Sequence, residues 1–400
     1  MKISILLPYK ENFSPEYPGA VSLFIKDTSS LSKYKKDLIV YGNTNYKNTF
    51  KLNYKNIELK KNIISSQTKQ YVEKFIKLEK LNKSIIIEIH NRPNYLNFIY
   101  KKLSNRSYTL FFHNDPLSME GSKRIKDRIF LLNKCFKIIF NSNWSKKRFL
   151  EGLDNKYVNS SKLLVCFQSA KKGHSKFIKK KKKWITFVGK LNKAKGYDVF
   201  ASTISDVLNK NKDWKAKIIG DEKREKIKLN HKNADLMGFQ VHKKVLNLFK
   251  DSSIAVVCSR WEEPFGRTSL EAAANGCAVI ISDRGGLPET VTNAIILKKL
   301  NSEELKKNIL FLLKNTKERN LLQTLSIKNF YLTHKYVANL IDNYRDEKIG
   351  NIKPFFTKKR KVPLRILHIT NFNERLDGRL FFNTGRRINN GFIRLGHSVL

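Results

Sequence analysis

Two glutamates, Glu263 and Glu271, are separated by seven residues in the stretch EEPFGRTSLE. The apolar run 253–259 before them is typical of a buried parallel strand, and the run 269–276 contains strong helix formers closed by Asn-Gly. Ligands of parallel α/β sheets bind beyond the carboxyl ends of the strands, so the loop between this strand and this helix is expected to contact a ligand. The helix start suits a phosphate, and the carboxylates can accept hydrogen bonds from sugar hydroxyls. Two glutamates alone are more often ordinary surface acids near a helix start, but the flanking strand and glycines favour a binding site.

A second loop carries cations. Gly189 and Gly196 bracket Lys190 and Lys195, between an apolar run at 184–188 and a helical pattern at 198–208. A glycine-containing loop with cations between a strand and a helix fits a diphosphate. The loop does not satisfy the P-loop pattern.

His113 and Gly19 follow two other apolar runs, at positions predicted to lie on the same edge of a sheet. His113 is either a hydrogen-bonded loop residue or a ligand contact, and its position alone does not decide between them. Gly19 lets the backbone approach a ligand at the first strand-to-helix junction. No G-x-G-x-x-G fingerprint is present, which argues against a dinucleotide-dependent epimerase or reductase.

The stretch EEPFGRTSLEAAANGCAVIISDRGGLPE resembles the donor-site signature E-x7-E of retaining GT-B glycosyltransferases of family four, the glycosyl transferases group 1. The stretch GKLNKAKG is similar to the G-R-L-x-x-x-K-G pattern of that family. The resemblance covers roughly 1–345 and is most specific from 184 to 289. Lys190 stands where the family has an arginine, so the chain lacks a bidentate fork there and a lower diphosphate affinity is expected.

The resemblance implies a retaining, metal-independent glycosyltransferase that moves a sugar from a nucleotide-diphosphate sugar to a glycan or lipid-linked acceptor. Cell-surface polysaccharide or lipopolysaccharide biosynthesis is the expected setting, and no cofactor or metal is expected. The implied catalytic residues are His113, Lys190, Lys195 and Glu263. The implied donor-binding residues are Gly19, Gly189, Gly238, Phe239, Phe265, Gly266, Arg267, Thr268 and Glu271. Glu271 is expected to meet the ribose, Gly238 and Phe239 the base, and the acceptor is expected near Gly19, His90 and Arg92.

Alternating strand and helix patterns predict an α/β fold with two Rossmann-like parallel-sheet domains that face each other across a cleft. The acceptor-side domain is expected at 1–170, with a helix at 330–347 that crosses back to it, and the donor domain at 183–329. The segment 348–400 is interpreted as a basic linker and an incomplete third Rossmann start, as in a truncated tandem enzyme.

The chain of 400 residues has a formal net charge of +45. That charge leaves a second function open, a non-catalytic protein that binds polyanions or nucleic acid. The densest lysine run, 179–183, has no interleaved aromatic residues, so nucleic acid is less favoured than a linker or contact with anionic lipid headgroups. Because no signal peptide, long apolar stretch or C-x-x-C pair is present, the expected location is the cytoplasm, including the inner face of the membrane. The donor base, sugar, acceptor, linkage and oligomeric state are not predicted.

Overall fold

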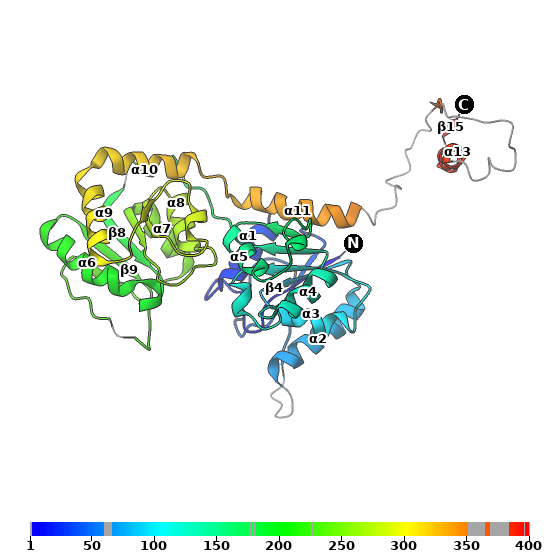
Figure 1. The fold of residues 1–400 in the computed structure, drawn as a ribbon, viewed down its shortest axis with the longest axis horizontal. Helices are drawn as coiled ribbons and strands as arrows, with labels where there is room; N and C mark the ends of the chain where they lie inside the picture. The colour runs from blue at the N-terminus through cyan, green and yellow to red at the C-terminus, as the bar shows by residue number, and fades with distance from the viewer. Residues whose placement is uncertain are drawn as a thin grey trace. The chain divides into compact units, whose positions relative to one another are not determined.

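The computed structural model describes residues 2–59, 66–175, 178, 181–225, 227–350, 365–368, 384–395 and 397–399. The chain forms two compact units, 1–345 and 346–400. The larger unit contains a 7-stranded and a 6-stranded parallel β-sheet, each covered by helices (Figure 1). The predicted α/β class with two Rossmann-like sheets is therefore confirmed.

The first sheet has the strand order β3-β2-β1-β4-β5-β6-β7. Its central strands are rich in Ile, Leu and Val and are buried along their length, as expected for parallel strands with both faces covered. With the helices α1–α5 and α11, this sheet forms the first lobe. Its elements are β1 (Ile3–Leu6), α1 (Ala20–Ser29), β2 (Leu38–Gly42), β3 (Tyr54–Asn56), α2 (Gln67–Asn82), β4 (Ile86–His90), α3 (Pro93–Tyr100), β5 (Ser107–Phe112), α4 (Ile125–Lys134), β6 (Lys137–Phe140), α5 (Asn143–Leu150) and β7 (Leu163–Val165).

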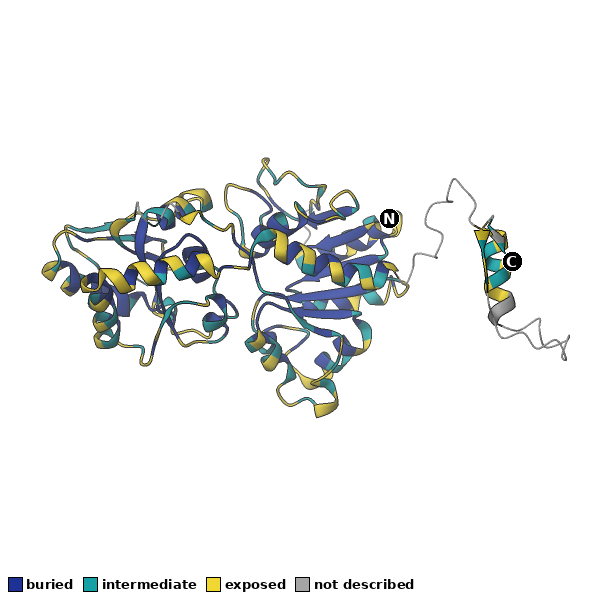
Figure 2. Cartoon of the chain, turned by 90° about the horizontal axis from the view of Figure 1, so that it is seen from above, coloured by how far each residue is buried: buried dark blue, intermediate teal, exposed yellow. Residues whose placement is uncertain are grey.

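The second sheet has the order β10-β9-β8-β11-β12-β13 and forms the second lobe with α6–α10. Figure 2 shows the strands of both sheets mostly in dark blue, the colour of buried residues. The elements of the second lobe are β8 (Lys182–Val188), α6 (Tyr197–Lys210), β9 (Lys215–Ile219), β10 (Ala234–Leu236), α7 (His242–Asp251), β11 (Ser252–Val257), α8 (Arg267–Ala274), β12 (Ala278–Ser282), β13 (Ile295–Leu297), α9 (Ser302–Lys314) and α10 (Thr316–Lys328).

Helix α11 (His334–Gly350) returns from the second lobe to the first. The buried guanidinium of Arg345 donates to both carboxylate oxygens of Glu88 on β4, at 2.7 and 2.8 Å. It also donates to Asp342, which in turn accepts hydrogen bonds from Ser32 and from the backbone N–H of Lys33 beyond α1. A buried charge needs such partners, so this network holds α11 against the first lobe.

The structure differs from the sequence prediction in several elements. β3, α3 and α4 were not predicted, and β8 begins at Lys182, within the lysine run 179–183. Residues 179 and 180 of that run lie outside the described residues. The domain limits at 170, 183 and 329 stay a prediction.

The smaller unit contains a parallel pair of short strands, β14 (Arg365–Ile366) and β15 (Ser398–Val399), with α13 (Thr384–Arg394) between them in sequence. This order agrees with the predicted strand, helix and strand of an incomplete Rossmann start. The predicted basic linker at 358–362 and the loop with Gly378 lie outside the described residues. Within the described part of the chain, no helix has the length and apolar character needed to cross a membrane.

Candidate functional site

A cavity of about 250 Å³ is lined by both lobes of the larger unit. Side chains that follow β5, β6, β8 and β11 reach it, so it lies beyond the carboxyl ends of strands of both sheets, where parallel sheets bind ligands. The predicted site residues that line it are His113, Gly189, Lys195, Glu263, Phe265, Gly266, Arg267 and Thr268. The predicted residues that do not line it are Gly19, Lys190, Gly238, Phe239 and Glu271.

Lys195 and Glu263 form an ion pair in this cavity, with Nζ 2.5 Å from Oε1. The Lys195 ammonium also lies 5.5 Å from the centre of the Trp261 ring. Its loop is held by Asn192, whose side chain accepts a hydrogen bond from the backbone N–H of Lys195. Gly196 ends this turn in the left-handed region, with φ of 71°, and a Cβ there would lie 1.7 Å from the carbonyl oxygen of Cys258. Close backbone packing thus places the lysine beside the glutamate.

The loop that carries Glu263 enters α8 through Gly266, which has a φ of 106°. Glycine adopts this conformation at low cost, and a Cβ at this position would lie 2.4 Å from Leu287. The Glu263 carbonyl accepts a hydrogen bond of 2.6 Å from the N–H of Gly286. The glycine turn after β12 therefore supports the loop that carries Glu263.

His113 and His90 form a buried pair, with Nε2 of His113 3.0 Å from Nδ1 of His90. Burial lowers the pKa of His113 to about 3 and also lowers the pKa of His90 well below its ordinary value. Both rings are therefore neutral near pH 7. Nδ1 of His113 and Nε2 of His90 have no hydrogen-bond partner among the described residues, so each ring keeps one unsatisfied nitrogen.

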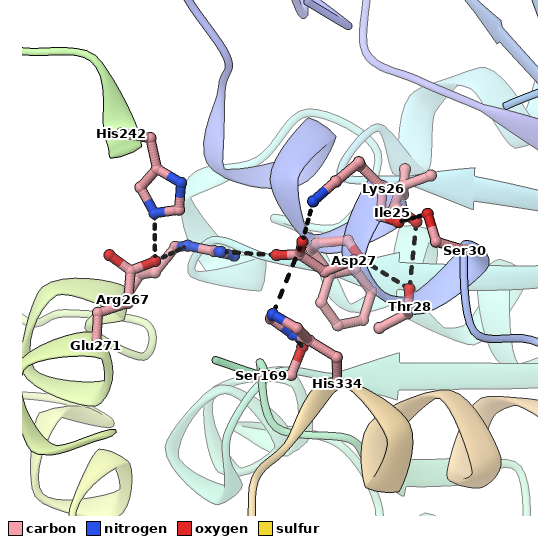
Figure 3. Close-up of polar contacts among 11 residues, drawn as sticks. Ile25, Lys26, Asp27, Thr28, Ser30, Ser169, His242, Arg267, Glu271 and His334 are labelled. Atoms are coloured by element: carbon pink, nitrogen blue, oxygen red, sulfur yellow. Dashed lines mark hydrogen bonds and ion pairs between the residues drawn. The ribbon is translucent and has the colours of Figure 1, made fainter. Parts of the chain in front are cut away.

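Arg267 connects the two lobes. Its Nε donates to Glu271 at 2.6 Å on the same helix, and its Nη2 donates to Asp27 of α1 at 3.0 Å (Figure 3). His242 contacts the same Glu271 oxygen at 2.8 Å, and His334 lies 3.8 Å from Asp27. Figure 3 shows Arg267 between the two carboxylates.

The pKa values of this cluster follow from its charges. Burial opposes the ionisation of Glu271 and Asp27. Arg267, together with His242 beside Glu271 and with His334 and Lys26 beside Asp27, outweighs burial, so the pKa of both carboxyl groups is lowered. Burial likewise disfavours the Arg267 cation, and its two carboxylate partners raise its pKa. Glu271, predicted to meet a ribose, is buried and engaged by Arg267 and His242 in this structure.

Gly19 is the N-cap of α1, but its neighbour Ala20 lines the cavity. The carboxylate of Glu11 accepts a hydrogen bond of 2.9 Å from the backbone N–H of Ser22, in the first turn of α1. A Cβ on Gly19 would lie 2.0 Å from the same Glu11 oxygen. Desolvation raises the pKa of Glu11. The helix start predicted to approach a ligand thus already holds an acidic group of this chain.

Gly238 and Phe239 follow β10 in an exposed turn. The Phe239 ring stacks on Tyr17 of the first lobe, with ring centroids 4.7 Å apart, and both rings are about half exposed. Lys190 is exposed on its loop and does not line the cavity. The turn that was predicted to bind the base and the first lysine predicted to bind the diphosphate therefore do not line the cavity.

Sequence reasoning missed several residues of the site. Asn141 and Ser259 follow β6 and β11 and line the cavity. Because ligands of parallel sheets bind beyond the carboxyl ends of the strands, their positions after these strands could have indicated them. His242 begins α7 and contacts Glu271, a pairing that no local pattern indicates. Among the described residues, no group of three or more His, Cys, Asp or Glu side chains is placed to hold a metal ion.

Residues 169–326 match the family model described as glycosyl transferases group 1. The matched segment includes the loop that carries Lys195 and the loop that carries Glu263, so the predicted resemblance to this glycosyltransferase family is confirmed. A retaining mechanism and a tandem architecture stay predictions.

Two curated proteins are similar in sequence to this chain. Spore coat protein SA of Bacillus subtilis is 24% identical over 232 residues, which cover 52% of this chain and 62% of that protein. An uncharacterized 41.2 kDa protein in the cps region of Klebsiella pneumoniae is 25% identical over 257 residues, which cover 58% of this chain and 69% of that protein. The chain thus spans less than two thirds of the spore coat protein's length.

Solved structures share the fold. HepE from Anabaena, solved in complex with UDP-glucose, superposes with a TM-score of 0.67 at 16% identity, and the match covers 88% of this chain and 100% of that one. Likeness at this identity establishes the two-sheet GT-B architecture.

Proposed function

We propose that this chain is a retaining, metal-independent glycosyltransferase. It transfers a sugar from a nucleotide-diphosphate sugar to a glycan or lipid-linked acceptor used in cell-surface polysaccharide. The observation that supports this best is the cavity in which His113 of the first lobe meets Lys195 and Glu263 of the second.

In the proposed mechanism, Lys195 and the N–H groups at the start of α8 stabilise negative charge on the leaving diphosphate. The diphosphate competes with Glu263 for the Lys195 ammonium, and this frees the carboxylate to accept hydrogen bonds from sugar hydroxyls. The cation in the cavity is fixed in advance by its loop, so little reorganisation accompanies the reaction. Lys190, exposed outside the cavity, contributes less than Lys195.

His113 orients the sugar ring as a neutral imidazole. Its low pKa keeps it uncharged, and its unsatisfied Nδ1 has the capacity for one more hydrogen bond. UDP-glucose is the first donor to test, because the structurally similar HepE was solved with it. The curated relative in a cps region supports a polysaccharide setting.

The test is turnover of the donor. Purified protein is incubated with UDP-glucose and then with other nucleotide sugars, and mass spectrometry follows the released nucleotide and the product. We expect Lys195→Ala and Glu263→Ala each to lower turnover at least about 100-fold, the usual effect of removing one preorganised stabilising group. Lys193→Ala is the matched control, because Lys193 is an exposed lysine of the same loop that does not line the cavity.

Near-normal turnover in both cavity variants would refute the proposed site. NMR of the anomeric centre in the product tests retention, and an inverted product would refute that part of the proposal. Turnover that requires added divalent metal after treatment with EDTA would contradict metal independence.

A further inference from the structure

A groove of about 660 Å³ lies between α2 and α3 on the first lobe, away from the residues that line the cavity. Val72 and Ile76 of α2 and Tyr95 of α3 are buried at its base. Phe98, one helical turn after Tyr95, is 53% exposed and also lines it. Each helix thus contributes one apolar stripe, and the groove has the size and apolar lining of a ligand pocket.

Lysines surround this apolar base. Lys69, Lys77 and Lys80 of α2 and Lys102 after α3 line the groove, with Glu73 as the one acidic residue among its lining side chains. All four lysines are exposed, and none forms an ion pair with a described residue. The groove therefore combines apolar surface with a local excess of positive charge.

The lysine run singled out in the sequence behaves differently. Lys181 is half-buried and donates to the carbonyls of Phe249 and Asn275. Lys182 pairs with Asp251 and Lys183 with Asp213. The described lysines of that run are thus engaged within the second lobe, whereas the lysines of the α2–α3 groove are not.

We propose that the α2–α3 groove binds an anionic phospholipid of a membrane surface. One acyl chain packs against Val72, Ile76 and Phe98, and the lysines hold the headgroup phosphate. Long lysine side chains bury their methylene stems along apolar surface and keep the ammonium in water, which suits such a site. A basic patch together with an inserted apolar group gives the two contributions that peripheral membrane binding requires. A free phosphate or a polynucleotide would leave the apolar base uncovered.

The groove is linked to the edge of the sheet that carries the cavity. Tyr9, just beyond β1, donates its backbone N–H to the Tyr95 hydroxyl at 3.1 Å and its own hydroxyl to Gln67 at the start of α2. The same loop continues to Gly19 and Ala20. Under the proposed function, the groove lies on the lobe that is expected to hold a lipid-linked acceptor. Lipid binding itself needs no sugar transfer, and its test uses no donor.

The experiment is flotation of the full chain with vesicles. Vesicles of phosphatidylcholine containing phosphatidylglycerol are compared with vesicles of phosphatidylcholine alone at near-physiological salt. We expect binding to the anionic vesicles only. Lys77→Gln with Lys80→Gln should weaken the apparent affinity about 30-fold, which corresponds to about 1 kcal/mol for each lysine near an anionic surface. Phe98→Gln leaves the net charge unchanged and should weaken it about tenfold.

The matched control is Lys314→Gln with Lys317→Gln, two exposed lysines of the second lobe whose replacement removes the same charge. We expect it to change binding less than threefold. Equal losses in the two double variants would overturn the proposal, because binding would then follow net charge alone. No binding by the unaltered chain, or full binding by Phe98→Gln, would overturn it as well. Circular dichroism checks that each variant is folded.

Discussion

Replacing Arg267 with leucine should destabilise the larger unit by about 3 kcal/mol. Removing one partner of a buried ion pair costs about 3 to 5 kcal/mol, because the remaining charge stays buried without compensation. Arg267 neutralises two buried carboxylates, Glu271 and Asp27, at 2.6 and 3.0 Å. Each keeps another partner, since Glu271 still contacts His242 at 2.8 Å and Asp27 still contacts Lys26 at 3.0 Å. The lower end of the range is therefore the appropriate value.

The assay is urea denaturation followed by circular dichroism. With a slope of about 3 kcal/mol per molar urea, a loss of about 3 kcal/mol lowers the midpoint by about 1 M. In the Arg267→Leu background, Glu271→Gln should recover part of the lost free energy of unfolding, because it removes one of the two buried carboxylates that Arg267 no longer neutralises. A loss below about 1 kcal/mol, or no recovery in the double variant, would refute this account of the cluster.

The pH dependence gives a second readout of the same variant. In the unaltered chain, Arg267 lowers the pKa of Asp27 and Glu271, so their contribution to stability is present above the unfolded values of about 4. It is lost as the pH falls through the lower folded values. Without Arg267, burial dominates and raises both pKa values, so the deficit of the variant should be largest near pH 7 and shrink near pH 4. A deficit that does not change with pH would contradict the assigned charges.

Three further predictions concern positions outside that cluster. Gly196→Ala should abolish soluble folded protein or lower the midpoint of thermal unfolding sharply, because a Cβ would lie 1.7 Å from the Cys258 carbonyl oxygen, and a normal melting curve would contradict the observed turn. Arg345→Met should destabilise the chain by about 3 to 5 kcal/mol in urea denaturation, because the Glu88 carboxylate stays buried, and Arg345→Met with Glu88→Gln should recover much of the loss. Burial lowers the pKa of His113 to about 3, so His113 should not titrate between pH 5 and 8. The pH profile of donor affinity over this range should therefore have the same shape in the unaltered chain and in His113→Gln.

Much of the architecture follows from local pattern. Buried runs such as those of β1 and β11 are apolar and β-branched, and such runs indicate parallel strands without knowledge of their neighbours. The acidic loop and Lys195 were found because strand, glycine and helix start follow one another in the chain. By contrast, β3 is a short strand of half-exposed and exposed residues with no apolar pattern, and α3 was missed although Pro93 at its first turn is a known start signal.

The remaining parts of the site depend on contacts between distant residues. Asp27 lies within α1 and looks like an ordinary helix residue until the fold places it 3.0 Å from Arg267. Glu11 reaches the start of α1 only because the loop after β1 turns back on itself. Lys190 and Lys195 are equivalent in the sequence pattern, yet only Lys195 lines the cavity. Side-chain direction in a loop is set by tertiary packing, which residue spacing does not encode.

We expect the cavity between His113, Lys195 and Glu263 to bind a nucleotide-diphosphate sugar. Calorimetric titration of the purified chain with UDP-glucose and with UDP tests it most directly, in parallel with Lys195→Ala and the loop control Lys193→Ala. We expect saturable binding that Lys195→Ala weakens about 10- to 100-fold, the value of a charge-assisted hydrogen bond, and that Lys193→Ala leaves unchanged. Binding that is equally strong in all three proteins, or no binding of any nucleotide sugar by the unaltered chain, would contradict the claim.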